Sequence, residues 1–368
     1  MTSRAVVIAG GGTAGHVLPA LAVAEGLVEL GYLHDDIHYL GAQRGVETRL
    51  VPASGLPHTF LEVVGLARSL HPRNVRFVTK MIAARRQAIA LMRRIRPAAV
   101  VSVGGYASLP AVLAARRLGV PVVVVSYDKR PGRASAFAAR RAAACAVAFP
   151  DSPLPRAVHT GAPLRRAIRV IDRVKDRDEA RRELGIPDDR LLVAVMGGSL
   201  GSGVLNDATA AYVASHAGDR RLAVRHVCGD RFLDRVPSPR DGADGILYDV
   251  VGFESRMPLL YAAADVLVGR GGASTVCEVA AVGIPAVLVP WAGAAEDHQT
   301  ANVRWLSDVG AAVLVPEAEL SAERFAAEVD RLLSDGTRRA ELAARAFEAG
   351  APHRSDALAR LIDGVARA

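Results

Sequence analysis

The stretch Gly10-Gly11-Gly12-Thr13-Ala14-Gly15-His16 follows the apolar run Ala5–Ala9 and precedes a helical pattern from Leu18 to Leu30. A strand that turns through glycines into a helix directs free backbone N–H groups and the positive helix end at one spot. Such a spot suits a phosphate or another anion. The start of the chain therefore predicts a strand, a glycine turn and a helix, which together begin an α/β fold.

The same glycines fit the pattern G-x-G-x-x-G, which alone is a weak dinucleotide fingerprint. The fingerprint also needs an acidic residue about 20 residues later, at the end of the second strand, to hold a ribose. Here the strand predicted at Ile37–Leu40 continues into Gly41-Ala42-Gln43-Arg44, which contains no carboxylate. A nicotinamide cofactor is therefore disfavoured.

Strands and helices alternate along the whole chain, which predicts parallel sheets covered by helices on both faces. Strands are predicted at Ala5–Ala9, Ile37–Leu40, Ala99–Val103, Val120–Val125, Ala144–Ala148, Leu191–Met196, Ala223–Val227, Ile246–Val250, Val266–Val268, Ala286–Val289 and Ala312–Val315. The charged stretch Arg165–Arg190 interrupts this rhythm. The strand, glycine turn and helix then return, with the second turn at Gly197–Gly203.

The repeated pattern predicts two Rossmann-like domains whose parallel sheets face one another across a cleft. The predicted divisions are residues 1–164, residues 165–350 and a C-terminal helix at 351–368 that packs back toward the first domain. In open α/β sheets ligands bind at the carboxyl ends of the strands. We therefore expect both glycine turns to lie in the cleft.

The composition fits two α/β domains. The chain has 368 residues, 51% of them apolar, which is enough for a core in each domain. Cys145, Cys228 and Cys277 are far apart and match no metal or C-x-x-C spacing, so we expect packing residues in a reducing compartment. The 19 uncharged residues Pro97–Ala115 approach the length of a membrane span. An internal glycine pair and a proline favour strand, turn and helix there instead.

The net charge of +8 is concentrated in the N-terminal half. Between Val63 and Pro150 there are sixteen Lys or Arg residues and one acid, Asp128. This balance suits either a solvated arginine-rich face or an anionic membrane surface. Nucleic acid is disfavoured because the region has few aromatic residues for base stacking and no recognition motif. The segment Arg73–Arg96 is predicted to be helical, but its arginines do not form one stripe.

His16 is the first candidate for chemistry. It lies at a predicted helix N-terminus, where the dipole should lower its pKa and keep the ring neutral. A neutral ring suits a general base or a hydrogen-bond acceptor. The alternative is a histidine that only caps or packs.

Two further polar groups follow predicted strands in the second half. In Gly269–Glu278, glycines and small residues permit close approach of a ligand, and Glu278 is placed to accept from a diol such as a ribose. The cluster Glu296–Asn302 could hydrogen-bond sugar hydroxyls or only cap the next helix through Asp297. Asp176-Arg177-Asp178 spells the D-x-D of metal-dependent sugar transferases, but its charged context indicates a helix start. No metal site is predicted.

Together these segments resemble the MurG family, UDP-N-acetylglucosamine transferases that act on undecaprenyl-diphosphate-linked muramoyl-pentapeptide. The similarity covers nearly the whole chain in order and spacing. It rests on GGGTAGHVLPALAVAEGL at 10–27, GGY at 104–106, GGSLGS at 197–202, RGGASTVCEVAAVGIPAVLVP at 270–290 and EDHQTANV at 296–303.

The resemblance implies a GT-B fold and an inverting transfer that needs no metal or other cofactor. The N-terminal half would take the lipid acceptor, and the C-terminal half would take UDP-N-acetylglucosamine. The protein would be peripheral on the cytoplasmic face of the plasma membrane, with the anionic inner-membrane surface as a partner. Other cell-wall synthesis or division proteins are further candidate partners.

The resemblance also implies residue roles. The catalytic candidates are His16 and Asp128, either of which would assist deprotonation of the acceptor. Gln299 would contact the GlcNAc hydroxyls, Glu278 the ribose, and the backbone at Phe253-Glu254 the uracil. The substrate-binding candidates are Thr13, Ala14, Gly15, Gly104, Gly105, Tyr106, Asp128, Arg165, Ser199, Glu254, Ala273, Ser274, Thr275, Glu278 and Gln299, with Arg165 and Ser199 at the diphosphate.

One segment departs from the family pattern. Where the family carries H-E-Q-N-x-x-P-G, this chain has Val125–Gly132, with Ser126 in place of the Glu and Asp128 in place of the Asn. An Asp carboxylate still accepts from a sugar hydroxyl but cannot donate as an amide does. Two alternatives therefore stay open. One is a glycosyltransferase with a different lipid or natural-product acceptor, and the other is a non-catalytic UDP-sugar-binding scaffold.

Overall fold

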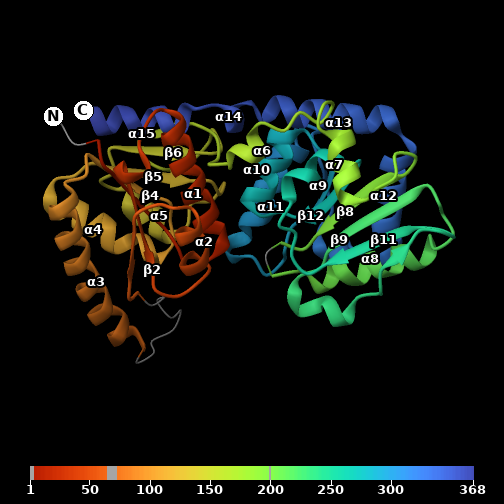
Figure 1. Ribbon diagram of the computed structural model, residues 1–368, viewed down its shortest axis with the longest axis horizontal. Coiled ribbons are helices and arrows are strands. Elements are labelled where there is room, and N and C mark those ends of the chain that lie inside the picture. Colours follow the sequence, from red (N-terminus) through yellow and green to blue (C-terminus); the bar gives the residue numbers. More distant parts are fainter. Residues whose placement is uncertain (1–3, 64–72, 199) are drawn as a thin grey trace. The chain divides into compact units, whose positions relative to one another are not determined.

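The computed structural model describes residues 4–63, 73–198 and 200–368. They form two compact α/β units (Figure 1). The N-terminal unit contains Met1–Arg166 together with Pro352–Ala368, and the C-terminal unit contains Ala167–Ala351. The N-terminal unit is therefore built from two separate parts of the sequence.

The N-terminal unit is organised around one sheet, whose described strands are all parallel. Their order across the sheet is β3-β2-β1-β4-β5-β6-β7. The strands are β1 (Val6–Ala9), β2 (Ile37–Ala42), β3 (His58–Leu61), β4 (Ala99–Ser102), β5 (Val122–Ser126), β6 (Ala144–Val147) and β7 (Ala157–His159). The central strands are buried along their whole length, as expected for a parallel sheet with helices on both faces.

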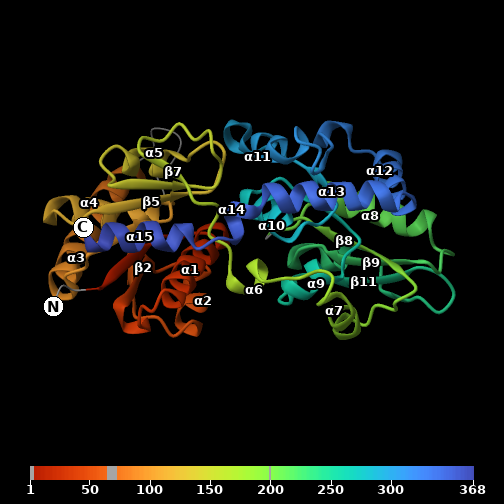
Figure 2. The same cartoon turned by 90° about the horizontal axis from the view of Figure 1, so that it is seen from above.

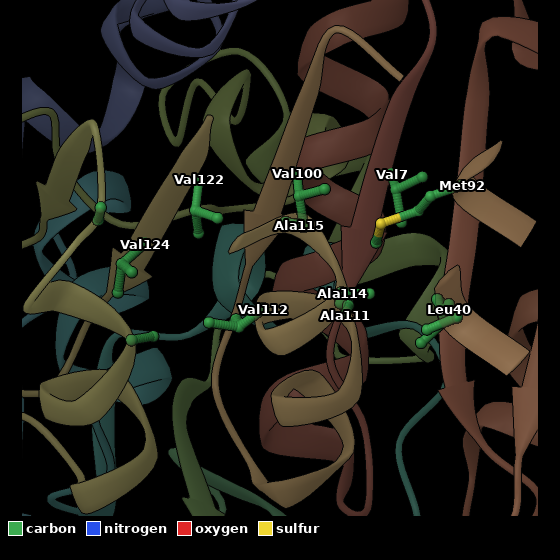
Figure 3. Close-up of a cluster of buried hydrophobic side chains, with 14 of the residues drawn as sticks. Val7, Leu40, Met92, Val100, Ala111, Val112, Ala114, Ala115, Val122 and Val124 are labelled. Atoms are coloured by element: carbon green, nitrogen blue, oxygen red, sulfur yellow. The ribbon is translucent and has the colours of Figure 1, made fainter. Parts of the chain in front are cut away.

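Helices cover this sheet. They are α1 (Ala14–Glu29), α2 (Glu47–Ala53), α3 (Arg73–Ile95), α4 (Leu109–Leu118), α5 (Arg133–Ala139), α14 (Ala351–Arg354) and α15 (Ala357–Arg367), with 3₁₀ turns η1 (His34–Asp36) and η2 (Tyr106–Ser108). On one face, Val100 and Val124 of the strands pack against Val112 of α4 and Met92 of α3 (Figure 3). Helix α15 packs against α1, β4 and β6 (Figure 2).

The C-terminal unit repeats this plan. Its strand order is β10-β11-β9-β8-β12-β13-β14, parallel except for the pair β10 and β11. The strands are β8 (Leu191–Met196), β9 (Leu222–Val227), β10 (Arg240–Asp241), β11 (Leu247–Val251), β12 (Val266–Arg270), β13 (Ala286–Val289) and β14 (Val313–Leu314). The helices are α6 (Arg166–Arg169), α7 (Arg177–Leu184), α8 (Gly203–Ser215), α9 (Met257–Ala263), α10 (Ala273–Val282), α11 (His298–Ser307), α12 (Ala322–Ser334) and α13 (Gly336–Ala349), with η3 (Asp230–Arg235), η4 (Ala295–Asp297) and η5 (Glu317–Glu319).

Most strand predictions are confirmed within one or two residues, and those for β8 and β13 have the correct ends. The sequence did not predict three short strands, β3, β7 and β10. The three cysteines are buried and free, which confirms them as packing residues.

Each sheet contains a switch point where the order of winding reverses. In the N-terminal unit it lies between the neighbours β1 and β4, and in the C-terminal unit between β8 and β12. Ligands of open α/β sheets bind beyond the carboxyl ends of the strands at such points. The four turns that follow these strands are therefore the first places to look for chemistry.

Candidate active site

The first glycine turn brings His16 to the N-terminus of α1. Thr13 is the N-cap residue in an extended conformation, but its hydroxyl does not cap the helix. Instead, Thr13 Oγ1 lies 3.0 Å from His16 Nδ1, within hydrogen-bond distance. Since this contact involves one ring nitrogen, it leaves Nε2 as the atom for other chemistry.

The turn after β4 closes against the first turn. Gly104 and Gly105 have φ angles of +96° and +73°, which side chains rarely permit. A Cβ atom at Gly105 would lie 2.7 Å from the Gly11 carbonyl oxygen, and one at Gly104 would lie 3.2 Å from His16 Cδ2. The positive φ angles thus favour glycine at both positions, and close approach excludes a side chain at Gly105 next to the Gly11 carbonyl and crowds one at Gly104 against the imidazole. Tyr106 follows in η2, with its ring edge-on to Phe77 at 6.1 Å between centroids.

The segment Val125–Gly132, which departs from the family pattern, contacts the first glycine turn. Pro19 lies inside α1 and has no N–H to donate to the carbonyl four residues earlier, that of Gly15. The Tyr127 hydroxyl donates to this carbonyl oxygen instead. The Tyr127 ring also lies edge-on to His16, with 6.4 Å between ring centroids. A residue that breaks the family pattern therefore satisfies a backbone group next to the candidate base.

The electrostatics keep His16 neutral. Burial lowers its pKa below the ordinary value, while the negative charges of Asp128 and Glu47 act in the opposite direction without prevailing. A neutral imidazole can accept a proton. Asp128 is half-buried, directly after β5 and Tyr127. The structure thus brings together His16, Asp128, Thr13 and the turn Gly104–Tyr106.

Glu47 is a residue that the sequence analysis missed. The strand β2 ends in a segment without a carboxylate, but Glu47 in the first turn of α2 is buried and reaches back to the first glycine turn. Its Oε1 accepts from the backbone N–H of Gly12 at 2.8 Å. The carboxylate of Glu47 therefore occupies a backbone N–H group of this turn that a substrate phosphate could otherwise have bound.

The C-terminal unit has its own pair of turns. After β8, Gly201 packs against the Cys228 carbonyl group so closely that a side chain would collide with it. After β12, Arg270 is buried and donates from Nη2 to Ser202 Oγ at 2.6 Å and to Glu317 Oε1 at 2.8 Å. Ser202 in turn caps α8 at the N–H of Leu205. Arg270 was not assigned a role from sequence, yet it ties the two turns together.

The start of α10 carries the next group of candidates. Ala273, Ser274 and Thr275 form its first turn, after the N-cap Gly272, whose residue type provides no capping side chain. One turn later Glu278 is half-buried, and its Oε2 accepts from the Tyr261 hydroxyl at 2.6 Å. Because Tyr261 is fully buried, this hydrogen bond fixes the direction of the carboxylate.

The cluster Glu296–Asn302, after β13, is hydrogen-bonded to the turn that follows β12. Gln299 Oε1 accepts from the Trp291 N–H at 2.9 Å, and Asn302 Nδ2 donates to the Gly271 carbonyl at 3.3 Å. The alternative that Asp297 caps α11 is wrong, because its side chain makes no capping hydrogen bond. Glu296 and Asp297 instead have left-handed φ angles of +55° and +53°, a strained conformation that is common at binding sites.

The remaining candidates have varied surroundings. Glu254 is buried and ion-paired to Arg225 at 2.6 Å, so its side chain is committed to the fold. Arg165 is half-buried in the N-terminal unit, between β7 and α6. Ser199 lies outside the described residues. The candidates thus form two groups, one in each unit.

Asp176-Arg177-Asp178 begins α7, which confirms the interpretation as a helix start. Within the described ranges, no group of three or more His, Cys, Asp or Glu side chains could hold a metal ion. None of the helices in the described part of the chain is both long and apolar enough to cross a membrane.

Comparison with known proteins identifies the family. The model of the glycosyltransferase family 28 N-terminal domain matches residues 6–147. The model of the family 28 C-terminal domain matches residues 192–358. The chain belongs to glycosyltransferase family 28.

Curated relatives with similar sequences carry the name UDP-N-acetylglucosamine–N-acetylmuramyl-(pentapeptide) pyrophosphoryl-undecaprenol N-acetylglucosamine transferase. The protein of Nocardioides sp. is 38% identical over 357 residues, covering 97% of each chain. That of Nocardia farcinica is 39% identical over 368 residues, covering 98% of this chain and 96% of the relative. The predicted resemblance to the MurG family is therefore confirmed.

Solved structures of glycosyltransferases support the fold. The crystal structure of Acinetobacter baumannii MurG matches with a TM-score of 0.73 and 28% identity over 99% of both chains. LpCGTa, solved in complex with UDP, matches with a TM-score of 0.68 at 15% identity over 99% of both chains, which shows the fold alone. The predicted fold class, a GT-B fold of two Rossmann-like α/β domains, is confirmed for this family 28 protein.

Proposed function

We propose that the protein transfers GlcNAc from UDP-GlcNAc to the 4-hydroxyl of undecaprenyl-diphosphate-linked MurNAc-pentapeptide, with inversion. The product is lipid II, the disaccharide precursor of peptidoglycan. The name and near-complete coverage of the curated relatives support this activity. The observation that carries it is the convergence of His16, Asp128 and Gly104-Gly105 at the switch point of the N-terminal unit.

In the proposed reaction the N-terminal unit binds the acceptor. The acceptor 4-oxygen attacks the anomeric carbon of GlcNAc, its proton moves to His16, and the bond from that carbon to the UDP oxygen breaks. The Thr13 contact on Nδ1 leaves Nε2 to receive the proton. Asp128 holds a sugar hydroxyl as an acceptor, with general base as its alternative role. Tyr106 is a further acceptor-binding residue in this proposal, and Thr13, Ala14 and Gly15 line the region of the donor sugar and diphosphate.

The C-terminal unit binds UDP-GlcNAc in this proposal. Glu278, directed by Tyr261, accepts from the ribose hydroxyls, and Gln299 contacts the GlcNAc. The N-terminus of α10 at Ala273–Thr275 stabilises the charge that grows on the leaving diphosphate, as oriented backbone donors do without a metal. The remaining donor contacts proposed are Arg165, Ser199 and the backbone at Glu254.

We further propose that the basic N-terminal unit docks on the anionic cytoplasmic face of the membrane, where the lipid acceptor resides. Each Lys or Arg near such a surface contributes about 1 kcal/mol, screened by salt. Co-sedimentation with vesicles should rise with anionic lipid and fall at high salt. Replacement of Arg85, Arg86, Arg93 and Arg94 on α3 by Glu should reduce it. Equal sedimentation with neutral and anionic vesicles would support a merely solvated face.

The segment Val125–Gly132 favours one alternative, the same donor with a different acceptor. The deciding experiment is transfer of radiolabelled GlcNAc from UDP-GlcNAc to synthetic lipid-linked muramoyl-pentapeptide, run in EDTA, with His16→Ala as the control. We expect a labelled disaccharide lipid from the parent and about 10²–10⁴-fold slower formation of it by His16→Ala. Binding of UDP-GlcNAc without transfer would contradict the proposed acceptor, and a requirement for magnesium or manganese would contradict the metal-free step.

A further inference from the structure

A buried carboxylate lies behind the first glycine turn, and no substrate role accounts for it. Glu47 is 0% exposed. Its Oε1 accepts from the Gly12 N–H at 2.8 Å and from the Ala42 N–H at 3.3 Å, so it links the turn after β1 to the last residue of β2. A Cβ atom at Gly11 would lie 2.5 Å from Oε1, and one at Gly45 would collide with Oε2. Two glycines thus make room for one carboxylate.

The second oxygen shows that bracing is not the whole role of Glu47. Within the part of the chain that the structure describes, Glu47 Oε2 is buried and has no hydrogen-bond partner. Burial of a charged group with an unsatisfied oxygen is costly. A brace between two backbone donors needs one acceptor atom and no charge. The charge of Glu47 acts on His16, whose pKa it raises, so the imidazole is the partner that this carboxylate can stabilise.

We propose that Glu47 is a positioning residue for glycosyl transfer: it fixes the first glycine turn and supplies a negative charge that acts on His16. This inference rests on the proposed role of His16 as the base. When His16 takes the acceptor proton it becomes an imidazolium cation, and a fixed carboxylate nearby stabilises that cation. Glu47 does this from behind the turn and touches no substrate.

The electrostatics of His16 agree with this geometry. The titratable groups that act on the ring are Glu47 from α2, Asp128 from the segment after β5, and the neighbouring Tyr127. Burial lowers the pKa of His16, and the charges of Asp128 and Glu47 raise it. Removal of the Glu47 charge should therefore lower this pKa further, so that the neutral base persists to lower pH.

The test compares kcat, KM and pH profiles of the full chain with UDP-GlcNAc and lipid-linked muramoyl-pentapeptide. In Glu47→Gln we expect kcat to fall tenfold or more and the KM for UDP-GlcNAc to stay within twofold. The acid limb of the pH profile of kcat should move to lower pH. Asp35→Asn is the matched control, because it removes one exposed acid before β2 and should leave all three unchanged. Added to His16→Ala, Glu47→Gln should reduce kcat by less than twofold.

A kcat within twofold of the parent and an unmoved acid limb in Glu47→Gln would overturn the inference. The inference would also be overturned if the fold loss of kcat in the double variant equalled the product of the losses in the two single variants, because Glu47 would then act independently of His16. Full turnover in His16→Ala would overturn the proposed base and this inference together. If Glu47→Gln does not fold, Glu47→Asp replaces it. That variant keeps the charge but shortens the reach, so kcat should fall while the acid limb stays, and an unchanged kcat overturns the inference.

Discussion

The two units repeat the same strand, glycine turn and helix, yet different groups contact the two turns: a carboxylate at the first, and an arginine paired with a glutamate at the second. At the first turn, Glu47 accepts from the Gly12 N–H, and the charge of Asp128 acts on the adjacent His16. At the second, the Arg270 guanidinium bonds to Ser202, while Glu317 pairs with Arg270. A glycine turn alone therefore does not determine what it binds. The acidic surroundings of the first turn suit a hydroxyl and proton transfer, whereas at the second turn the Arg270–Glu317 ion pair holds the adjacent turns in place.

Removal of the imidazole should have the largest effect. A general base contributes about 10²–10⁴-fold in rate, so His16→Ala should lower kcat by that factor. Calorimetric affinity for UDP should stay within twofold, because the proposed uridine contacts lie in the C-terminal unit. A large loss of UDP affinity in this variant would contradict the proposal that the first turn serves the acceptor and the C-terminal unit binds UDP.

The matching change in the C-terminal unit is Glu278→Ala. Loss of a charged hydrogen bond costs about 1.5–3 kcal/mol, so UDP should bind roughly 10–150-fold more weakly. Tyr261→Phe removes the donor that directs Glu278 and should have a smaller effect in the same direction. If UDP affinity of Glu278→Ala stays within twofold of the parent, Glu278 does not belong to the site.

Asp128→Asn tests which role Asp128 has beside the first turn, because it restores the family residue and removes a charge. If Asp128 holds a sugar hydroxyl, turnover should stay within about tenfold, since an amide oxygen still accepts. This is the result we expect. A fall of ~10² or more in kcat with unchanged UDP affinity would instead make Asp128 the base.

The smallest effect should come from Tyr127→Phe. It leaves the Gly15 carbonyl without the donor that Pro19 cannot supply, at a cost of about 1–2 kcal/mol. Thermal unfolding of the N-terminal unit should shift down by roughly 2–8 °C. Tyr106→Phe, which removes a hydroxyl from the neighbouring turn, is the control. Equal melting temperatures for the two variants would show that the hydroxyl of Tyr127 is dispensable.

The fold was largely predictable because long apolar runs and glycine turns are local signals. Runs such as Leu191–Met196 are buried over most of their length, so hydrophobicity alone locates them. The missed strands lack this signal. The three residues of β7 are all exposed, and β10 is two charged residues. Their strand conformation comes from pairing at a sheet edge, which the sequence does not encode locally.

From the residues alone, contacts in the site were predictable only where its parts are close in sequence, whereas Asp128 and Gly104–Tyr106 were assigned to the site of His16 through the family resemblance. The pair Thr13 and His16 lies within one helical turn. Glu47 reaches Gly12 from 35 residues away, and Tyr127 reaches Gly15 from 112 residues away. The signal for Glu47 was an acid that follows a strand and is preceded by Gly41 and Gly45. Its partner, however, becomes evident only when β1 and β2 are paired.

The discontinuous N-terminal unit has a consequence for synthesis on the ribosome. Helix α15 buries Leu358 and Ile362, packs against α1 and β4, and follows the whole C-terminal unit in the chain. At 5–20 residues per second, the intervening segment Ala167–Ala351 takes roughly 10–40 s to emerge. During that time the apolar surface that α15 will cover is exposed to chaperones and to other nascent chains. The unit whose sheet is synthesised first is therefore the last to be completed.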